Sequence, residues 1–129
     1  MMILGFDHYN LRADRDTMEL LKVFYRDVVG LTLGERPPLK SFGYWLYAGG
    51  KDVLHLSEVR EGETALHDIK TTFDHVAFRA KDLQRSVQHL EALGIEFSQR
   101  EISTTHTVQV FFKDPAGNGV ELNFAKQDI

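Results

Sequence analysis

Hydrophobic residues recur along this chain with two different periods, and the periods alternate in the same order twice. Apolar side chains three or four positions apart lead up to Gly30, and a second such run leads up to Gly94. This spacing is typical of an amphipathic helix, and glycine favours the left-handed conformation that follows a helix end. The pattern predicts one helix in each half, with apolar sides formed by Met18, Leu21, Val23, Phe24, Val28 and Val29 and by Leu83, Val87, Leu90 and Leu93.

Short extended segments surround each predicted helix. Residues 31–33 and 95–97 follow the helices, and each is followed by a pair of apolar runs around a glycine-containing turn. Such pairs are typical of β-hairpins. The predicted hairpins comprise 45–47 and 53–56 around a turn at 49–52, and 110–112 and 120–124 around a turn at 114–119.

A repeated heptad begins each half of the chain. Residues 7–13 read Asp-His-Tyr-Asn-Leu-Arg-Ala and residues 74–80 read Asp-His-Val-Ala-Phe-Arg-Ala, so four of the seven positions are identical. The glycines after the helices lie 64 residues apart and the heptad histidines 67 apart. We therefore predict an α+β fold in which a single domain, residues 1–129, contains two strand–helix–strand–strand–strand modules. The modules span about 1–60 and 71–129 and are joined by a polar linker.

Composition narrows the classes of function. The formal net charge is −4 and the charges are interspersed, whereas a nucleic-acid-binding surface would show clustered Lys and Arg. No run approaches the roughly 18 apolar residues of a membrane span, and the first residues do not read as a signal peptide. The chain has no cysteine, which excludes thiolate ligands and cysteine nucleophiles and fits a reducing compartment. We expect a cytoplasmic protein that acts on a small molecule, without nucleic-acid or membrane partners.

Four ionisable side chains occupy corresponding strand positions in the two halves. His8 and His75 lie in the first strand of each module, and His55 and Glu121 lie in the last. Because side chains alternate along a strand, the apolar neighbours of these residues point toward the helices and the four point away from them. A pseudo-twofold relation between the modules would bring all four together. Imidazole and carboxylate ligands predict one divalent metal ion per site: Zn, Ni, Co, Mn or Fe.

Other residues of the same strands are candidates for substrate contacts. Alternation places Gln109 and Asn123 on the face of the predicted site, where their amides are expected to bind substrate oxygens. Arg79 either neutralises an anionic substrate or pairs with an acidic neighbour. Phe111 either lines the pocket or packs in the core.

These features resemble the vicinal oxygen chelate superfamily, which includes glyoxalase I, extradiol dioxygenases, fosfomycin-resistance thiol transferases and bleomycin-resistance proteins. The resemblance rests on the duplicated module, the Asp-His pair at each module start, and residues 113–122, Lys-Asp-Pro-Ala-Gly-Asn-Gly-Val-Glu-Leu. It implies two βαβββ modules whose mixed β-sheets curve into a cup around the metal, with the helices outside. It also implies a homodimer, with each site built within one chain or across two.

The superfamily's ligand set of two histidines and one carboxylate corresponds to His8, His75 and Glu121. In glyoxalase I the position of His55 carries a fourth ligand, a glutamate. The resemblance therefore implies a divalent-metal-dependent lyase or isomerase of glyoxalase type, in which Glu121 or His55 moves a proton. The metal, the substrate and the use of a thiol such as glutathione stay open.

Two further functions are compatible with the same residues. An Fe(II) extradiol dioxygenase uses the same three ligands, but it typically carries a tyrosine about ten residues before the glutamate, where this chain has Phe111. A non-enzymatic binding protein of the resistance type would hold a small molecule without turnover. A fosfomycin-resistance enzyme ranks lower, because no potassium-binding serine and glycine loop is evident.

Overall fold

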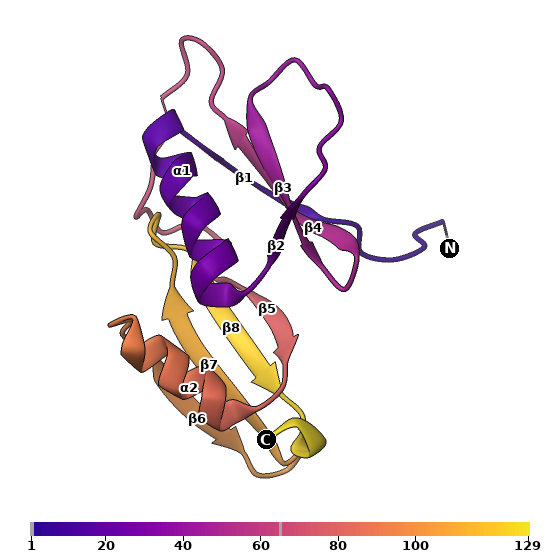
Figure 1. Cartoon of the computed structure of the whole chain (residues 1–129), viewed down its shortest axis with the longest axis vertical. Helices are drawn as coiled ribbons and strands as arrows, with labels where there is room; N and C mark the ends of the chain where they lie inside the picture. Colours follow the sequence, from indigo (N-terminus) through magenta and orange to yellow (C-terminus); the bar gives the residue numbers. More distant parts are fainter. Residues whose placement is uncertain (1, 65) are drawn as a thin grey trace. The chain divides into compact units, whose positions relative to one another are not determined.

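The chain folds into two compact units, Met1–His67 and Asp68–Ile129. A computed structural model describes residues 2–64 and 66–129; residues 1 and 65, the latter in the expected linker, lie outside the described residues. Each unit contains one four-stranded mixed sheet and one main helix (Figure 1). The predicted α+β fold of two βαβββ modules is thereby confirmed, whereas the organisation of the modules as one domain stays a prediction.

The first unit follows the predicted order of elements. It comprises β1 (Tyr9–Ala13), α1 (Arg15–Phe24), the π-helix η1 (Tyr25–Val29), β2 (Thr32–Gly34), β3 (Gly43–Ala48) and β4 (Lys51–Glu58). The strand order in the sheet is β1-β4-β3-β2. The first and last strands of the unit pair in parallel, and the other neighbours pair antiparallel.

The second unit repeats this topology. It comprises β5 (His75–Ala80), α2 (Leu83–Ala92), β6 (Ser98–Ile102), β7 (Thr107–Lys113), β8 (Gly119–Phe124) and the short 3-10 helix η2 (Lys126–Asp128). The strand order is β5-β8-β7-β6, with β5 and β8 parallel. The sequence repeat thus corresponds to a repeat of structure.

The helices end at the predicted glycines, although the two ends differ. After α1 the chain widens into η1, where the Tyr25 carbonyl oxygen accepts hydrogen bonds from the backbone N–H groups of Gly30 (3.1 Å) and Leu31 (2.8 Å). After α2 the Ile95 N–H donates to the Leu90 carbonyl at 2.9 Å, and Gly94 has a φ of 68°. This second arrangement is a Schellman cap.

Two predicted boundaries are wrong for local reasons. The segment 95–97 is not a strand, because Ile95 still belongs to the helix cap and β6 begins only at Ser98. The turn of the first hairpin is shorter than predicted. Gly49 and Gly50 have φ values of 57° and 79°, so two residues suffice for a type I′ turn and β4 begins at Lys51.

The hydrophobic core of each unit lies between its helix and one face of its sheet. In β4 the side chains of Leu54 and Leu56 are fully buried, and in β8 Val120 and Leu122 are buried likewise. The apolar neighbours of His55 and Glu121 thus lie in the core as predicted, although His55 and Glu121 are themselves largely buried. In the described part of the chain, no helix is long and apolar enough to cross a membrane.

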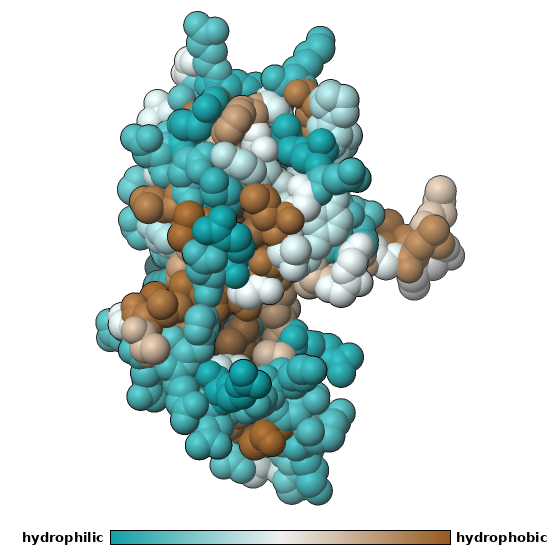
Figure 2. Space-filling model, viewed as in Figure 1, coloured by the Kyte–Doolittle hydropathy of each residue, from teal (hydrophilic) through white to brown (hydrophobic). Residues whose placement is uncertain are grey.

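The residues that precede β1 differ from the core in having exposed apolar side chains. Met2, Ile3, Leu4 and Phe6 are all largely exposed, and this segment projects from the first unit (Figure 1, Figure 2).

Candidate metal centre

The histidine of each repeated heptad is held by the aspartate that precedes it. His8 Nδ1 donates to an Asp7 carboxylate oxygen at 2.7 Å, and His75 Nδ1 donates to Asp74 at 2.7 Å. The hydrogen bond from the imidazole lowers the pKa of each aspartate below its usual value. A carboxylate on Nδ1 fixes the tautomer and leaves Nε2 with its lone pair, the usual arrangement of metal-bound histidine.

The second unit brings one imidazole and one carboxylate together. His75 Nε2 lies 3.2 Å from Glu121 Oε1, and Asn123 Nδ2 donates to the other carboxylate oxygen at 2.9 Å. Glu121 is only 4% exposed. Ligands bound to one metal at about 2 Å lie about 3 Å apart, so this pair fits two positions of a coordination sphere.

Gly119 allows β8 to approach His75. A Cβ atom at this position would lie 2.3 Å from the Asp74 carbonyl oxygen and 2.9 Å from His75 Cβ. Any side chain would therefore displace the strand or the histidine. This explains why the stretch 113–122 needs a glycine at the first position of the strand that carries Glu121.

A buried aspartate shapes the turn that leads to Gly119. Asp114 accepts hydrogen bonds from the backbone N–H groups of Ala116 and Asn118, both at 2.9 Å, and from Asn118 Nδ2 at 3.0 Å. Together these bonds hold the chain reversal between β7 and β8. The motif that suggested the family thus has a structural role that positions Glu121.

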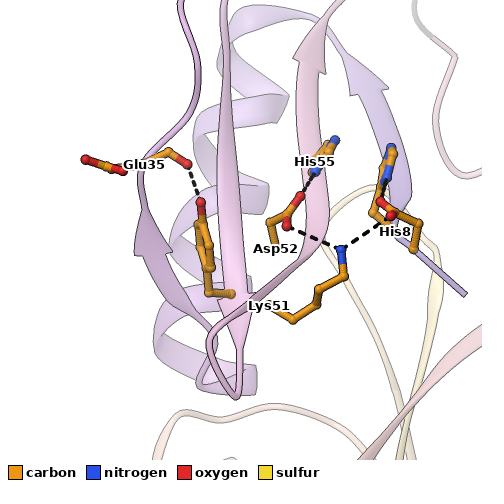
Figure 3. A network of polar contacts seen from close by, with 7 residues as sticks. His8, Glu35, Lys51, Asp52 and His55 are labelled. Atoms are coloured by element: carbon orange, nitrogen blue, oxygen red, sulfur yellow. Dashed lines mark hydrogen bonds and ion pairs between the residues drawn. The ribbon is translucent and has the colours of Figure 1, made fainter.

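His55 occupies a different environment from the other predicted ligands. Its ring is stacked between His8, with centroids 3.7 Å apart, and Trp45, with centroids 3.9 Å apart. Its Nε2 donates to Asp52 Oδ2 at 2.7 Å (Figure 3). Imidazole lone pairs lie in the plane of the ring and these two planes are nearly parallel, so one ring must turn before both lone pairs can point at the same ion. Ligation by His55 stays a prediction.

Lys51 joins the two histidine–aspartate pairs of the first unit. Its Nζ lies 3.5 Å from Asp7 Oδ2 and 3.4 Å from Asp52 Oδ1 (Figure 3). The contact between Asp52 and His55 is not predicted from the sequence, because a regular strand directs residues 52 and 55 to opposite faces. The pairing shifts between Leu46↔Leu54 and Tyr47↔Asp52, so a β-bulge brings Asp52 to the face of His55.

The four predicted ligands are thus found as two pairs. His8 and His55 are neighbours in the first unit, and His75 and Glu121 in the second. Across residues 2–64 and 66–129, no three histidine or acidic side chains form a single group that could hold a metal ion. The donor types and the supported Nε2 atoms fit a divalent metal, and convergence of the pairs stays a prediction.

The predicted substrate residues surround Glu121 on its sheet. Phe111 lies opposite Glu121 in the register of β7 and β8, Gln109 lies opposite Asn123, and Asn123 pairs with Arg79 of β5. A cavity of about 640 Å³ opens in the same unit, with His75 and Phe111 in its wall. Phe111 also packs edge-on against His75, with ring centroids 5.6 Å apart. Contact of these residues with a substrate stays a prediction.

Comparison with known proteins identifies similar sequences and folds. The sequence model of the Glyoxalase/Bleomycin resistance protein/Dioxygenase superfamily matches residues 5–122. Similar solved structures include a glyoxalase family protein from Bacillus anthracis (23% identity, 98% of each chain covered, TM-score 0.73). They also include lactoylglutathione lyase from Agrobacterium tumefaciens (24% identity, 98% of each chain, TM-score 0.69).

A third similar structure is FosX, a fosfomycin resistance protein from Listeria monocytogenes, in complex with Mn(II) and 1S,2S-dihydroxypropylphosphonic acid. It shares 17% identity, with 96% of this chain and 94% of that chain covered and a TM-score of 0.73. At these identities the similarity concerns the fold. The comparison with curated proteins gave no match.

Proposed function

Because the chain belongs to the Glyoxalase/Bleomycin resistance protein/Dioxygenase superfamily, we propose that it is a divalent-metal-dependent lyase or isomerase of glyoxalase type. Its substrate is a small molecule that chelates the metal through two oxygens. The observation that carries this proposal is the pair formed by His75 Nε2 and Glu121 Oε1, 3.2 Å apart, with Asp74 and Asn123 behind it.

We assign the metal to Nε2 of His8, Nε2 of His75 and the carboxylate of Glu121. A divalent ion bound there supplies Lewis-acid polarisation of substrate oxygens. The two Asp–His pairs support this assignment, because a carboxylate behind a ligating imidazole orients the ring and makes the nitrogen a better donor. Zn, Ni, Co, Mn and Fe all suit this donor set.

We assign the proton transfer to His55, with Glu121 as the alternative. Asp52 accepts from Nε2 of His55 and leaves Nδ1 as the nitrogen that can take a proton. Stacking between two rings fixes the plane of this imidazole. The arrangement resembles catalytic bases whose second nitrogen is oriented by a carboxylate. Glu121 would instead have its oxygens engaged by the metal and by Asn123.

We also propose that the protein is a homodimer, as the family resemblance implies. Each chain carries one pair of ligands in each of its units. A complete site therefore takes one pair from a first unit and one from a second unit, from the same chain or from two copies.

Activity assays on the metal-loaded protein test the proposed function. We expect metal-dependent isomerisation of the hemithioacetal formed by a thiol and a small ketoaldehyde to the corresponding 2-hydroxy thioester, abolished by a chelator and restored by one of the five metals. His55→Gln should lower kcat by about 100-fold or more, the usual contribution of general base catalysis. Tyr47→Phe is a matched control, since the Tyr47 hydroxyl bonds to the Glu35 backbone away from the site.

The alternatives predict different outcomes of the same assays. Consumption of oxygen by the Fe(II)-loaded protein in the presence of catechols would indicate that the protein is a dioxygenase and not an isomerase. Tight ligand binding without turnover of any substrate would indicate a binding protein.

A further inference from the structure

Four polar side chains form a row across the whole sheet of the second unit. Arg79 of β5 pairs in register with Asn123 of β8, and Asn123 pairs with Gln109 of β7. Gln109 in turn pairs with Arg100 of β6. Residues paired directly across neighbouring strands project from the same face of a sheet. With strands about 4.8 Å apart, the row is about 14 Å long, with cations at its ends and amides in its centre.

This polar row lies directly beside the proposed metal ligand. Asn123 is two residues after Glu121 on β8, which corresponds to a shift of about 7 Å along the strand. The side chains of the two residues are also in contact, because Asn123 Nδ2 donates to Glu121 Oε2 at 2.9 Å. A ligand bound at Glu121 can therefore contact the polar row with a group that lies only a few bonds from its metal-binding oxygens.

The polar row has hydrogen-bonding capacity that the protein itself does not use. The side-chain oxygen of Gln109 is buried, and within the described residues it has no hydrogen-bond partner. Buried polar atoms normally have partners, so this oxygen calls for a donor from outside. Arg79 and Arg100 are exposed, and among residues 2–64 and 66–129 neither forms an ion pair.

The corresponding positions of the first unit show that the fold does not require this row. There Arg12 Nε donates to Ser57 Oγ at 3.3 Å, and Ser57 Oγ donates to Asn10 at 3.0 Å, so the polar groups satisfy one another. The residue paired with Ser57 on β3 is Gly43. The module is therefore stable with a glycine in the place of Gln109 and with its arginine bound to the sheet.

We propose that the polar row binds the anionic end of the substrate, a carboxylate or a phosphate group. This inference rests on the proposed function, because it places the anion on the same molecule whose oxygens reach the metal. Guanidinium groups bind both anions through paired N–H donors, and the amide N–H groups of the row add further donors. The free oxygen of Gln109 selects ligands that carry a hydroxyl or N–H next to the anion. The substrate class is thus a small hydroxylated or amide-bearing oxyacid.

Titration of the metal-free, ¹⁵N-labelled full-length protein with inorganic phosphate and with lactate tests the proposal. We expect saturable NMR shifts of the side-chain N–H signals of the row. Arg79→Gln and Arg100→Gln should each weaken binding of the preferred anion at least fivefold. Arg85→Gln, on the exposed side of α2, is the matched control and should leave the affinity unchanged. The anion that binds more tightly identifies the class.

A second comparison tests the role of Gln109. Gln109→Leu should weaken the binding of lactate more than the binding of propionate, which lacks the hydroxyl. Absence of saturable binding of both anions, or equal binding by the arginine variants and the wild type, would overturn the proposal. The metal content of the arginine variants, measured separately, should equal that of the wild type. A failure of the proposed metal site is therefore distinguishable from a failure of the polar row.

Discussion

The exposed aspartates beside the site histidines orient the imidazole rings. Asp7 and Asp74 are each the first residue of the repeated Asp-His dipeptide, and each accepts a hydrogen bond from Nδ1 of the histidine that follows it. Nε2 of each histidine is then the nitrogen left to bind a metal ion. The sequence showed the repeated Asp-His pair, but adjacent residues of a strand normally face opposite sides, so it did not predict the contact.

Removing one of these aspartates should weaken metal binding without removing a ligand. We expect Asp74→Ala to lower the affinity for Zn²⁺ or Ni²⁺ by about 10- to 100-fold, because the His75 ring loses its orientation and its tautomer. Competition titration against a chelating dye measures the affinity. Asp16→Ala, at the exposed start of α1, should bind metal like the wild type. Equal affinities for both variants would contradict the role of Asp74.

Lys51 should govern the ionisation of the carboxylate behind His8. The pKa of Asp7 is lowered by the hydrogen bond from His8 and by the charge of Lys51. Lys51→Met should therefore raise the pKa of Asp7 partway toward its ordinary value. Because ionised Asp7 is favoured in the folded state, its contribution to stability is present above pH 3.8 and is lost as the pH falls through the lowered pKa.

Carboxylate NMR titration of the Lys51→Met variant measures this shift. The internal control is Asp14, whose pKa is lowered by hydrogen bonds from Thr17 at the start of α1 and should not change. An unchanged pKa of Asp7 would show that the lysine has no influence on this pair.

At the scale of elements, the apolar periodicity of the sequence predicts which helices and hairpins form more accurately than it predicts where they begin and end. Both helices and both hairpins were predicted, since their apolar spacing is regular. The π-helical turn at Tyr25, the cap that extends to Ile95 and the bulge near Asp52 were not predicted. Each depends on a backbone hydrogen bond or a pairing shift that no apolar pattern records. The bulge matters most, because it creates the Asp52–His55 contact.

The approach of β8 to β5 should depend on the absence of a side chain at position 119. Gly119→Ala would introduce a Cβ atom 2.3 Å from the Asp74 carbonyl oxygen, and neither backbone segment can move freely within a paired sheet. We expect a loss of about 1–3 kcal/mol in the free energy of unfolding, as for other overpacked sites. Urea denaturation measures it. Gly5→Ala, where an added Cβ meets no atom within 4 Å, is the control.

At the scale of the whole molecule, the duplication divides the proposed site between two similar units. The sequence predicts four ligand positions that converge on one ion, and the structure places them as two neighbouring pairs, His8 with His55 and His75 with Glu121. The sequence does not predict which side chains of each unit contact and orient the predicted ligands. These come from Asp52 and Trp45 in one unit and from Asn123 in the other.

Mixing two variants tests whether each site takes its ligand pairs from two chains. A His8→Ala chain has an intact second pair, and a Glu121→Ala chain has an intact first pair. If sites are built across a dimer, the mixed dimer contains one complete site, and we expect metal binding that neither variant shows alone. Metal content of the purified mixed dimer measures it. Absence of restored binding would place both pairs of a site in one chain.

The most direct test of the account is the metal content of the purified protein after reconstitution, measured for the wild type and for His8→Ala, His75→Ala and Glu121→Ala. His89→Ala, on the exposed side of α2, is the matched control. We predict about one divalent metal ion per chain in the wild type and the control, and a large loss in each of the three ligand variants. A wild-type protein that takes up no divalent metal, or ligand variants that retain it fully, would contradict the account.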